Sequence, residues 1–184
     1  MQDSVNRIAI LKSGALGDVL MTTPFLRALR QKFPSAVIDY WVGEWSAIAL
    51  RDNPNVNSVK AVPDKFFHSK NPFLALKIIL ALRSGKYDAL FILDKSYLAN
   101  LLGLATGIKS RIGFDRNGEG FVNTINVKYD ELKHAIDLMK QRQIALPHHG
   151  YTSMHFALLS NSYHALLQGY FFSGNTALQF EMHW

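Results

Sequence analysis

The sequence contains no cysteine, which excludes a disulfide scaffold, a thiolate zinc site and a cysteine nucleophile. It also lacks the run of about 18 apolar residues that a membrane-spanning helix needs, and its first residues lack the apolar core of a signal peptide. We therefore expect a soluble, cytoplasmic protein. Acidic residues are scarce beside basic ones, 14 against 20, and the formal net charge of +6 predicts attraction to anionic partners.

Charge is distributed unevenly along the 184 residues. All 20 basic and 13 of the 14 acidic residues lie in residues 1–142, whereas Glu181 is the only formal charge in residues 143–184. With 48% hydrophobic residues overall, general disorder is excluded. We expect a folded domain over residues 1–142. Residues 143–184 form an atypical charge-poor tail, which is too short for an independent core.

Strand and helix signals alternate through the first 142 residues. Apolar runs rich in β-branched residues predict strands at residues 7–12, 37–42, 56–62, 87–94 and 111–114. Apolar residues at helical spacing predict helices at about residues 20–33, 72–82, 98–105 and 130–141. Such alternation is typical of an α/β fold, here a Rossmann-like parallel sheet with helices on both faces.

The start of the first helix has two readings. Asp18 caps the helix and Pro24 kinks it, or Thr23 caps the helix and Pro24 occupies the first helical position. The residues leave both readings open.

The first predicted strand ends in a glycine-bearing loop, KSGALGD at residues 12–18. Ligands of a parallel sheet bind beyond the carboxyl ends of its strands, and glycine lets the backbone approach a ligand closely. Asp18 can act there as a general base that takes a proton from a bound hydroxyl, or it can merely cap a helix.

A dinucleotide site is disfavoured, and with it a nicotinamide-dependent oxidoreductase. The fingerprint of such sites has three glycines after the first strand, and this loop offers two, Gly14 and Gly17. Asp39 and Glu44 stand near the usual position of the ribose-binding acid, but a lone acid there is a weak signal. No phosphate-binding P-loop motif occurs either.

Residues 7–36, RIAILKSGALGDVLMTTPFLRALRQKFPSA, resemble the amino-terminal signature of glycosyltransferase family 9, which comprises the ADP-heptose:lipopolysaccharide heptosyltransferases and their relatives. The runs YDALFILD (87–94), RIGFDR (111–116) and HAID (134–137) follow in the expected order. The resemblance covers about residues 7–142. It implies the amino-terminal, acceptor-side half of a GT-B glycosyltransferase.

The resemblance also implies a function. Family members transfer a sugar from an ADP-sugar to a lipopolysaccharide core acceptor, with inversion and without a metal or cofactor. The motif aspartate, taken as the base that deprotonates the acceptor hydroxyl, corresponds to Asp18. Family acceptors are anionic and anchored in the inner leaflet, so we expect a basic surface to be drawn to anionic lipid at the inner face of the inner membrane. We find no nucleic-acid-binding signature.

Further residues are expected to bind the acceptor. The loop after the first strand is shaped by Lys12, Ser13, Gly14 and Gly17. The loop after the third predicted strand carries Lys65, His68 and Lys70. The resemblance implies that these residues reach toward an acidic acceptor; the alternative is that they form only a solvated charged loop. Arg111 and Arg116 hold an anionic acceptor or a leaving diphosphate, or make only surface ion pairs.

Aromatic and histidine residues are weaker candidates. Trp41, Trp45, Phe66 and Phe67 can stack on sugars, although such aromatics more often belong to the core or its rim. The histidines of the tail are His148, His149, His155, His164 and His183. We expect no metal site among them, because adjacent histidines do not face one ligand on a helix and no carboxylate is near to orient them.

The chain departs from the family pattern in two ways. Gly14 and Ala15 stand where many heptosyltransferases have hydroxyl residues before the Gly-Asp pair, and nothing in residues 143–184 resembles the donor-binding domain. We expect the tail to be a truncated, out-of-frame or divergent ending, with an apolar run at residues 163–172 that packs on a partner or favours aggregation. The alternative function is therefore a non-catalytic remnant or binding module.

Overall fold

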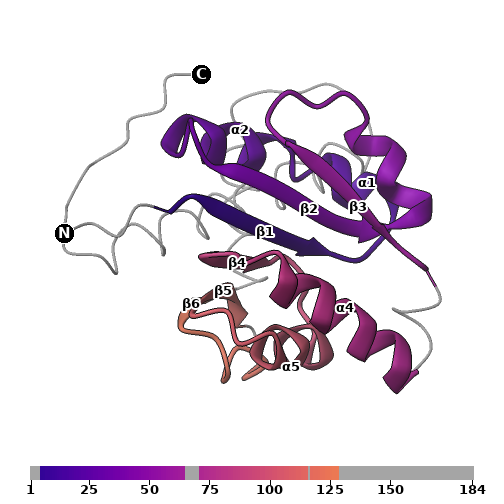
Figure 1. Cartoon of the computed structure of the whole chain (residues 1–184), viewed down its shortest axis with the longest axis vertical. Coiled ribbons are helices and arrows are strands. Elements are labelled where there is room, and N and C mark those ends of the chain that lie inside the picture. Colours follow the sequence, from indigo (N-terminus) through magenta and orange to yellow (C-terminus); the bar gives the residue numbers. More distant parts are fainter. Residues whose placement is uncertain (1–4, 65–70, 116, 129–184) are drawn as a thin grey trace, which may run out of the picture.

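The computed structural model describes residues 5–64, 71–115 and 117–128. Six parallel strands form one sheet in the order β3-β2-β1-β4-β5-β6. Their bounds are β1 Arg7–Lys12, β2 Val37–Gly43, β3 Ser58–Val62, β4 Ala89–Ile92, β5 Ser110–Asp115 and β6 Ile125–Lys128. The chain builds outward from β1 to β3 and then crosses to the other side of β1, so the strand order reverses between β1 and β4 (Figure 1).

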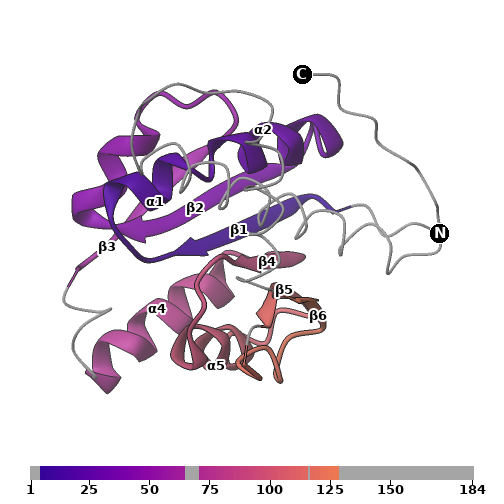
Figure 2. The ribbon, with the colours of Figure 1, turned by 180° about the vertical axis from the view of Figure 1, so that it is seen from behind.

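Helices cover both faces of the sheet. The first face carries α1 (Leu16–Leu20), α2 (Thr23–Lys32) and the 3-10 helix η1 (Glu44–Leu50), and the second carries α4 (Pro72–Ser84) and α5 (Tyr97–Ala105). Figure 2 shows the sheet between these two layers. Among the described residues, none of the helices is long and apolar enough to cross a membrane. The predicted α/β fold, a parallel sheet with helices on both faces, is confirmed.

Strand β1 shows why both faces must be covered. Its side chains alternate between the two faces, and both sets are apolar and fully buried. Ile8 and Ile10 pack in the core under α1 and α2, whereas Ala9 and Leu11 pack under α4 and α5. On the first face, Phe25 of α2 meets Phe91 of β4 edge to face, with ring centroids 5.4 Å apart. A strand that is apolar on both sides is stable only inside such a three-layer arrangement.

The beginning of the first helical region differs from both sequence-based readings. Residues 16–32 form two helices, and their N-caps are Ala15 and Thr22, neither with a side-chain capping hydrogen bond. Pro24 does lie in the first turn of α2. Between the helices, the Thr22 and Thr23 hydroxyls donate to the carbonyls of Val19 and Leu20 at 2.7 and 2.8 Å, which satisfies carbonyls at the end of α1 that have no helical partner.

Two elements of the structure were not predicted from the sequence, and two predicted regions lie outside the described residues. Neither η1 nor β6 was predicted. The helix expected at residues 130–141 and the tail at 143–184 lie outside the described residues, so the predicted boundary near residue 142 stays a prediction.

A buried polar contact joins β2 to the chain just before β4. Asp39 is 4% exposed, and its Oδ2 accepts a hydrogen bond of 2.7 Å from the Tyr87 hydroxyl. The Arg7 guanidinium lies 3.7 Å from the same oxygen. Burial raises the pKa of Tyr87 to about 12, and the hydrogen bond to Asp39 acts in the same direction. Asp39 is thus a partner of Tyr87 and Arg7 in the fold, although its position resembles that of a ribose-binding acid.

Replacing Tyr87→Phe should lower the free energy of unfolding by about 1–3 kcal/mol at pH 7, because a buried carboxylate oxygen loses a donor. The raised pKa of Tyr87 means that the fold favours the neutral phenol. That contribution is complete below pH ~10 and is lost as the pH rises through ~12. Urea unfolding between pH 7 and 11 should therefore show the gap between wild type and variant narrowing above pH ~10; a constant gap would contradict this.

Candidate active site

The reversal of strand order fixes where a ligand would bind. In a parallel sheet, the crevice outside the carboxyl ends of the two strands at such a reversal is the usual ligand site. Here these strands are β1, which ends at Lys12, and β4, which ends two residues before Asp94. The Leu93 amide donates to the Leu11 carbonyl at 2.9 Å, so the two strand ends stay side by side and bring Lys12 and Asp94 together.

Lys12 and Asp94 form an ion pair below the crevice. The Lys12 ammonium lies 3.1 Å from Asp94 Oδ1, and the two side chains are only 10% and 7% exposed. The second oxygen, Oδ2, accepts a hydrogen bond of 2.6 Å from the Ser13 amide. Both carboxylate oxygens therefore have a donor, as a charge removed from water requires. This pair fixes the beginning of the loop at residues 12–18.

Asp18 lies on the solvent side of Lys12. Its Oδ2 is 3.8 Å from the Lys12 ammonium, and its side chain is 44% exposed. It sits inside the first turn of α1 and caps neither helix, so the reading of Asp18 as a helix cap is wrong. A carboxylate that is held near a cation and open to solvent can accept a proton from a hydroxyl bound beside it.

Gly14 allows the loop to close around this cation. Its φ of +130° is a conformation that other residues rarely adopt. A β-carbon at Gly14 would lie 3.1 Å from Asp18 Oδ2 and 3.2 Å from the Lys12 ammonium. The Ser46 hydroxyl of η1 donates to the Gly14 carbonyl at 2.6 Å, which holds the loop from the other side. A β-carbon at Gly17, by contrast, would point into open space.

A cavity of about 420 Å³ adjoins the same edge of the sheet between α4 and α5. Its walls come from apolar residues of the two helices, and Ser13 and Asp94 also line it. The residues of its lining are Leu11, Ser13, Asn71, Pro72, Ala75, Ile79, Asp94, Ser96, Leu98, Ala99, Leu101, Leu102 and Ala105. An apolar group would fit these walls better than a charged one.

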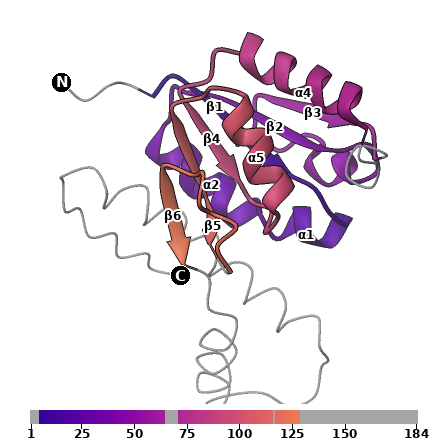
Figure 3. The same cartoon turned by 90° about the horizontal axis from the view of Figure 1, so that it is seen from below.

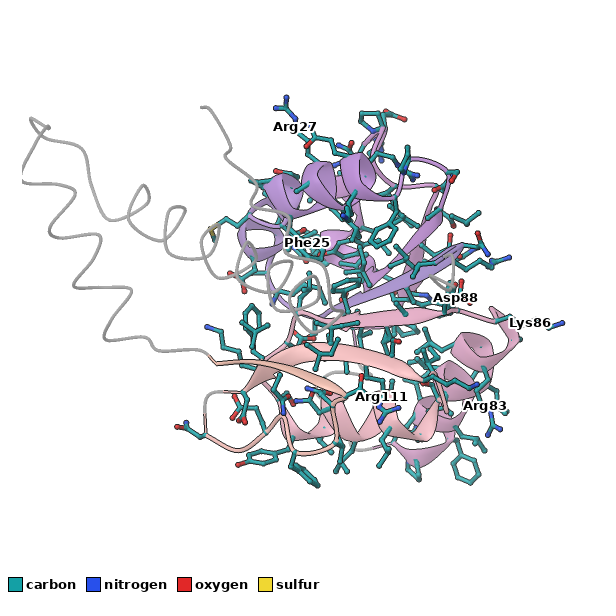
Figure 4. All side chains as sticks on the ribbon, turned by 90° about the vertical axis from the view of Figure 1, so that its left-hand side faces the viewer. Phe25, Arg27, Arg83, Lys86, Asp88 and Arg111 are labelled. Carbon is teal, nitrogen blue, oxygen red and sulfur yellow. The ribbon has the colours of Figure 1, made fainter. Side chains whose placement is uncertain are left out.

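Arg111 does not reach this site. It is the second residue of β5 and pairs with Leu90 at the beginning of β4, so it lies at the amino-terminal edge, opposite the crevice. Its guanidinium donates to the carbonyls of Ile108 at 2.6 Å and Val122 at 3.0 Å, and Figure 4 labels it beside β5. The structure therefore gives Arg111 a role in holding its own loop and does not bring it together with Lys12, Gly14 and Asp18; a contact with an acceptor stays a prediction.

Four predicted binding residues lie outside the described part of the chain: Lys65, His68, Lys70 and Arg116. Their contacts with an acceptor stay predictions. The histidines singled out in the tail lie outside it too. Within residues 5–64, 71–115 and 117–128, no group of three or more histidines and carboxylates is placed to hold a metal ion.

The two tryptophans near the end of β2 differ in exposure. Trp41 is 8% exposed and belongs to the core beneath α4, so it does not stack on a ligand. Trp45 is 78% exposed and precedes Ser46, whose hydroxyl contacts the Gly14 carbonyl. Its ring is therefore exposed, one residue before the side chain that holds the Gly14 carbonyl. Phe66 and Phe67 lie outside the described residues.

Two residues of the site, Asp94 and Ser46, were not predicted from the sequence. Asp94 ends the predicted strand at residues 87–94, and the rule that directed attention to Asp18, that ligands bind at carboxyl ends of strands, applies equally there. No sequence signal indicates Ser46, because η1 itself was not predicted.

Curated relatives of this chain are heptosyltransferases, although no family model matches it. Lipopolysaccharide heptosyltransferase 2 of Escherichia coli K12 is 30% identical over 144 residues, 76% of this chain and 39% of the relative. Lipopolysaccharide heptosyltransferase 3 of the same strain is 32% identical over 90 residues, 47% of this chain and 25% of the relative. The chain therefore spans 39% or less of the length of these two relatives.

Solved structures share the fold. The E. coli ADP-heptose lps heptosyltransferase II matches with a TM-score of 0.56 and 24% identity over 68% of this chain and 35% of that one. A glycosyl transferase family 9 protein from Veillonella parvula matches with a TM-score of 0.60 and 22% identity over 88% and 43%. E. coli heptosyltransferase WaaC with ADP-2-deoxy-2-fluoro heptose matches with a TM-score of 0.59 and 20% identity over 84% and 54%. At these identities the likeness shows the GT-B type of fold.

Replacing Asp94→Ala should lower the free energy of unfolding by about 3–5 kcal/mol, because it leaves the buried Lys12 ammonium without its nearest anion. Asp18→Ala is the matched control, since the same change at a half-exposed carboxylate 3.8 Å from Lys12 should cost about 1 kcal/mol or less. Urea unfolding of both variants measures the difference. Equal losses would show that the burial of Asp94 does not govern the loop.

Replacing Gly14→Ala should destabilise the protein by about 1–3 kcal/mol, because the added methyl forces a strained φ beside Lys12 and Asp18. Gly17→Ala, at the second residue of α1, should not destabilise the protein, because its methyl meets open space and alanine has the higher helix propensity. Thermal and urea unfolding compare the two. Equal stability of both variants would contradict the loop conformation described here.

Proposed function

We propose that this chain, which belongs to glycosyltransferase family 9 and spans 39% of the length of its relative lipopolysaccharide heptosyltransferase 2, supplies the acceptor side of a sugar transferase. The reaction moves a sugar, heptose in the named relatives, from an ADP-sugar to a lipopolysaccharide core acceptor. It inverts the anomeric centre and uses no metal. One observation carries the proposal: the half-exposed Asp18 carboxylate stands beside a buried cation at the reversal of strand order.

The chemistry assigned to Asp18 is proton removal. An acceptor hydroxyl in the crevice gives its proton to the Asp18 carboxylate while its oxygen forms a bond to the anomeric carbon of the donor. The bond from that carbon to the diphosphate breaks, and ADP leaves with the electron pair. Attack from the side opposite the leaving group inverts the configuration.

Lys12 acts as a positioning residue in this reaction. Its ammonium is held by the buried Asp94 and lies 3.8 Å from Asp18. The attraction keeps the Asp18 carboxylate directed toward the crevice. Because the cation is fixed by a buried partner, it needs no reorganisation when a neighbouring group gains or loses charge.

Acceptor binding is proposed for the surface around the glycine loop. Trp45 offers an exposed aromatic face for a sugar ring, and the open space beside Gly17 admits a ring close to the backbone. Lys65, His68, Lys70 and Arg116 remain candidates for gripping the anionic groups of the acceptor. We place the whole protein in the cytoplasm, in peripheral contact with the inner face of the inner membrane.

A binding module that does not transfer sugar is the second candidate. The observation that favours it is that the described residues form the single parallel sheet to which the resemblance assigns acceptor binding, whereas the resemblance assigns donor binding to another domain. A transfer and donor-hydrolysis assay on the purified 184-residue chain separates the two functions. Turnover supports the transferase, whereas acceptor binding without turnover supports the module.

Replacing Asp18→Asn should lower kcat of the transferase by about 10²–10⁴-fold, the usual contribution of a general base. The amide keeps the shape of the side chain but cannot take up the proton. Transfer from an ADP-sugar to a lipopolysaccharide core oligosaccharide gives the rate, and calorimetric titration of the oligosaccharide gives its affinity, which should change little.

The matched control is Asp52→Asn, the same substitution at an exposed carboxylate between η1 and β3. It should leave both rate and affinity unchanged. Near-normal turnover by Asp18→Asn would refute the assignment of the base.

A further inference from the structure

Most exposed large apolar side chains of the described residues belong to α4 and α5. They cover the outer surface of the two helices, which contact each other and lie on the same side of the sheet (Figure 3). The members of this surface, the α4–α5 face, are Phe73, Leu76, Leu80, Tyr97, Leu98, Leu101 and Leu104. Phe73 is 82% exposed and Leu98 is 65% exposed, so most of the surface of these two side chains is not covered by the described residues.

The spacing on α4 shows that its outer side is apolar as a stripe. Phe73, Leu76 and Leu80 recur at intervals of three and four residues, which places them on one side of the helix. The opposite side carries Ile78 and Leu82, which are buried against the sheet. A helix that is apolar all round is normally covered on all sides. The outer stripe of α4 therefore has the composition of a covered surface, although the described residues leave it open.

The formal charges on α4 and α5 are of one sign, and the first carboxylate after α4 is the exposed Asp88, which accepts hydrogen bonds from the Asn6 and Arg7 amides. Residues 71–87 contain no aspartate or glutamate, and α5 contains none either. Lys77, Arg83 and Lys86 are exposed on or just after α4. Figure 4 shows Arg83 and Lys86 on the side of the molecule opposite Arg27 of α2. The apolar stripe and the cations of α4 have no carboxylate among them. They are complementary to a partner that has an apolar interior and an anionic surface.

We propose that the α4–α5 face docks on an anionic lipid bilayer. This rests on the proposed function, in which the acceptor is lipid-linked, and it names the surface that makes the contact. The leucines and Phe73 enter the boundary between headgroups and acyl chains, while Lys77, Arg83 and Lys86 meet lipid phosphates. A second copy is a poorer occupant, because a two-fold interface on this face would set cations against cations.

The docked face is continuous with the candidate active site. Leu98 and Leu101 belong to the α4–α5 face and also line the cavity, and the same cavity is lined by Ser13 and Asp94. A saccharide anchored in the bilayer would therefore leave the membrane next to Asp94, whose ion-pair partner Lys12 lies 3.8 Å from Asp18. The helices bring the enzyme to its acceptor, and the loop after β1 acts on the part that protrudes.

Vesicle co-sedimentation of the 184-residue protein tests the proposal. Wild type should bind phosphatidylglycerol vesicles at least tenfold more tightly than phosphatidylcholine vesicles, and added salt should weaken binding. Leu76→Gln/Leu80→Gln should lower the partition coefficient at least tenfold, and Lys77→Glu/Arg83→Glu should abolish the preference for anionic lipid. These side chains are exposed, so circular dichroism and thermal unfolding should match wild type.

The controls are Arg27→Glu on α2 and Ile48→Gln on η1, the same kinds of change on the other side of the sheet, and both should bind vesicles as wild type does. Unchanged binding by the two α4 variants, or no binding by wild type, overturns the proposal. So does a wild-type dimer that Leu76→Gln/Leu80→Gln dissociates, because a second copy then covers the face. Transfer to a water-soluble acceptor should be unaffected by the α4 variants. A negative result for membrane binding would therefore not contradict the role of Asp18, which the Asp18→Asn variant tests separately.

Discussion

The buried ion pair between Lys12 and Asp94 is the contact on which the candidate site depends. It joins the ends of the two strands at which the sheet reverses its order. A lysine removed from water needs an anion of fixed position, and Asp94 is fixed in turn by the Ser13 amide. Every other feature of the loop follows from this cation: the conformation of Gly14, which passes close to it, and the position of Asp18, which lies on its open side.

Much of the fold could be predicted from sequence because buried parallel strands leave a strong signal. β1 and β2 are apolar on both faces, and their predicted bounds agree with the structure to within one residue. Short elements gave no comparable signal. β6 has four residues at the edge of the sheet, and η1 has seven residues in tight turns. The division between α1 and α2 depends on two threonine hydroxyls that bond backward to carbonyls, which periodicity does not reveal.

Site residues that are close in the sequence could be predicted as a group. Site residues that meet only because their strands are neighbours in the sheet were harder to predict. Lys12, Gly14 and Asp18 share one loop, so a short motif indicates them as a group. Asp94 joins them only because β1 and β4 are neighbours, an arrangement that the order of elements along the chain does not specify. Arg111 lies near the beginning of β5, at the edge of the sheet away from Asp94, because the position of a residue within its strand decides at which edge of a parallel sheet it lies.

The separation of 82 residues between Lys12 and Asp94 also has a consequence for synthesis. On a ribosome that adds about 5–20 residues per second, the aspartate is joined to the chain roughly 4–16 seconds after the lysine. During that interval β1, β2 and β3 can emerge while the ammonium at the end of β1 still lacks its counter-ion. The nascent half-sheet therefore has one edge of β1 uncovered until β4 arrives, and this stage is the one at which a chaperone would have most to protect.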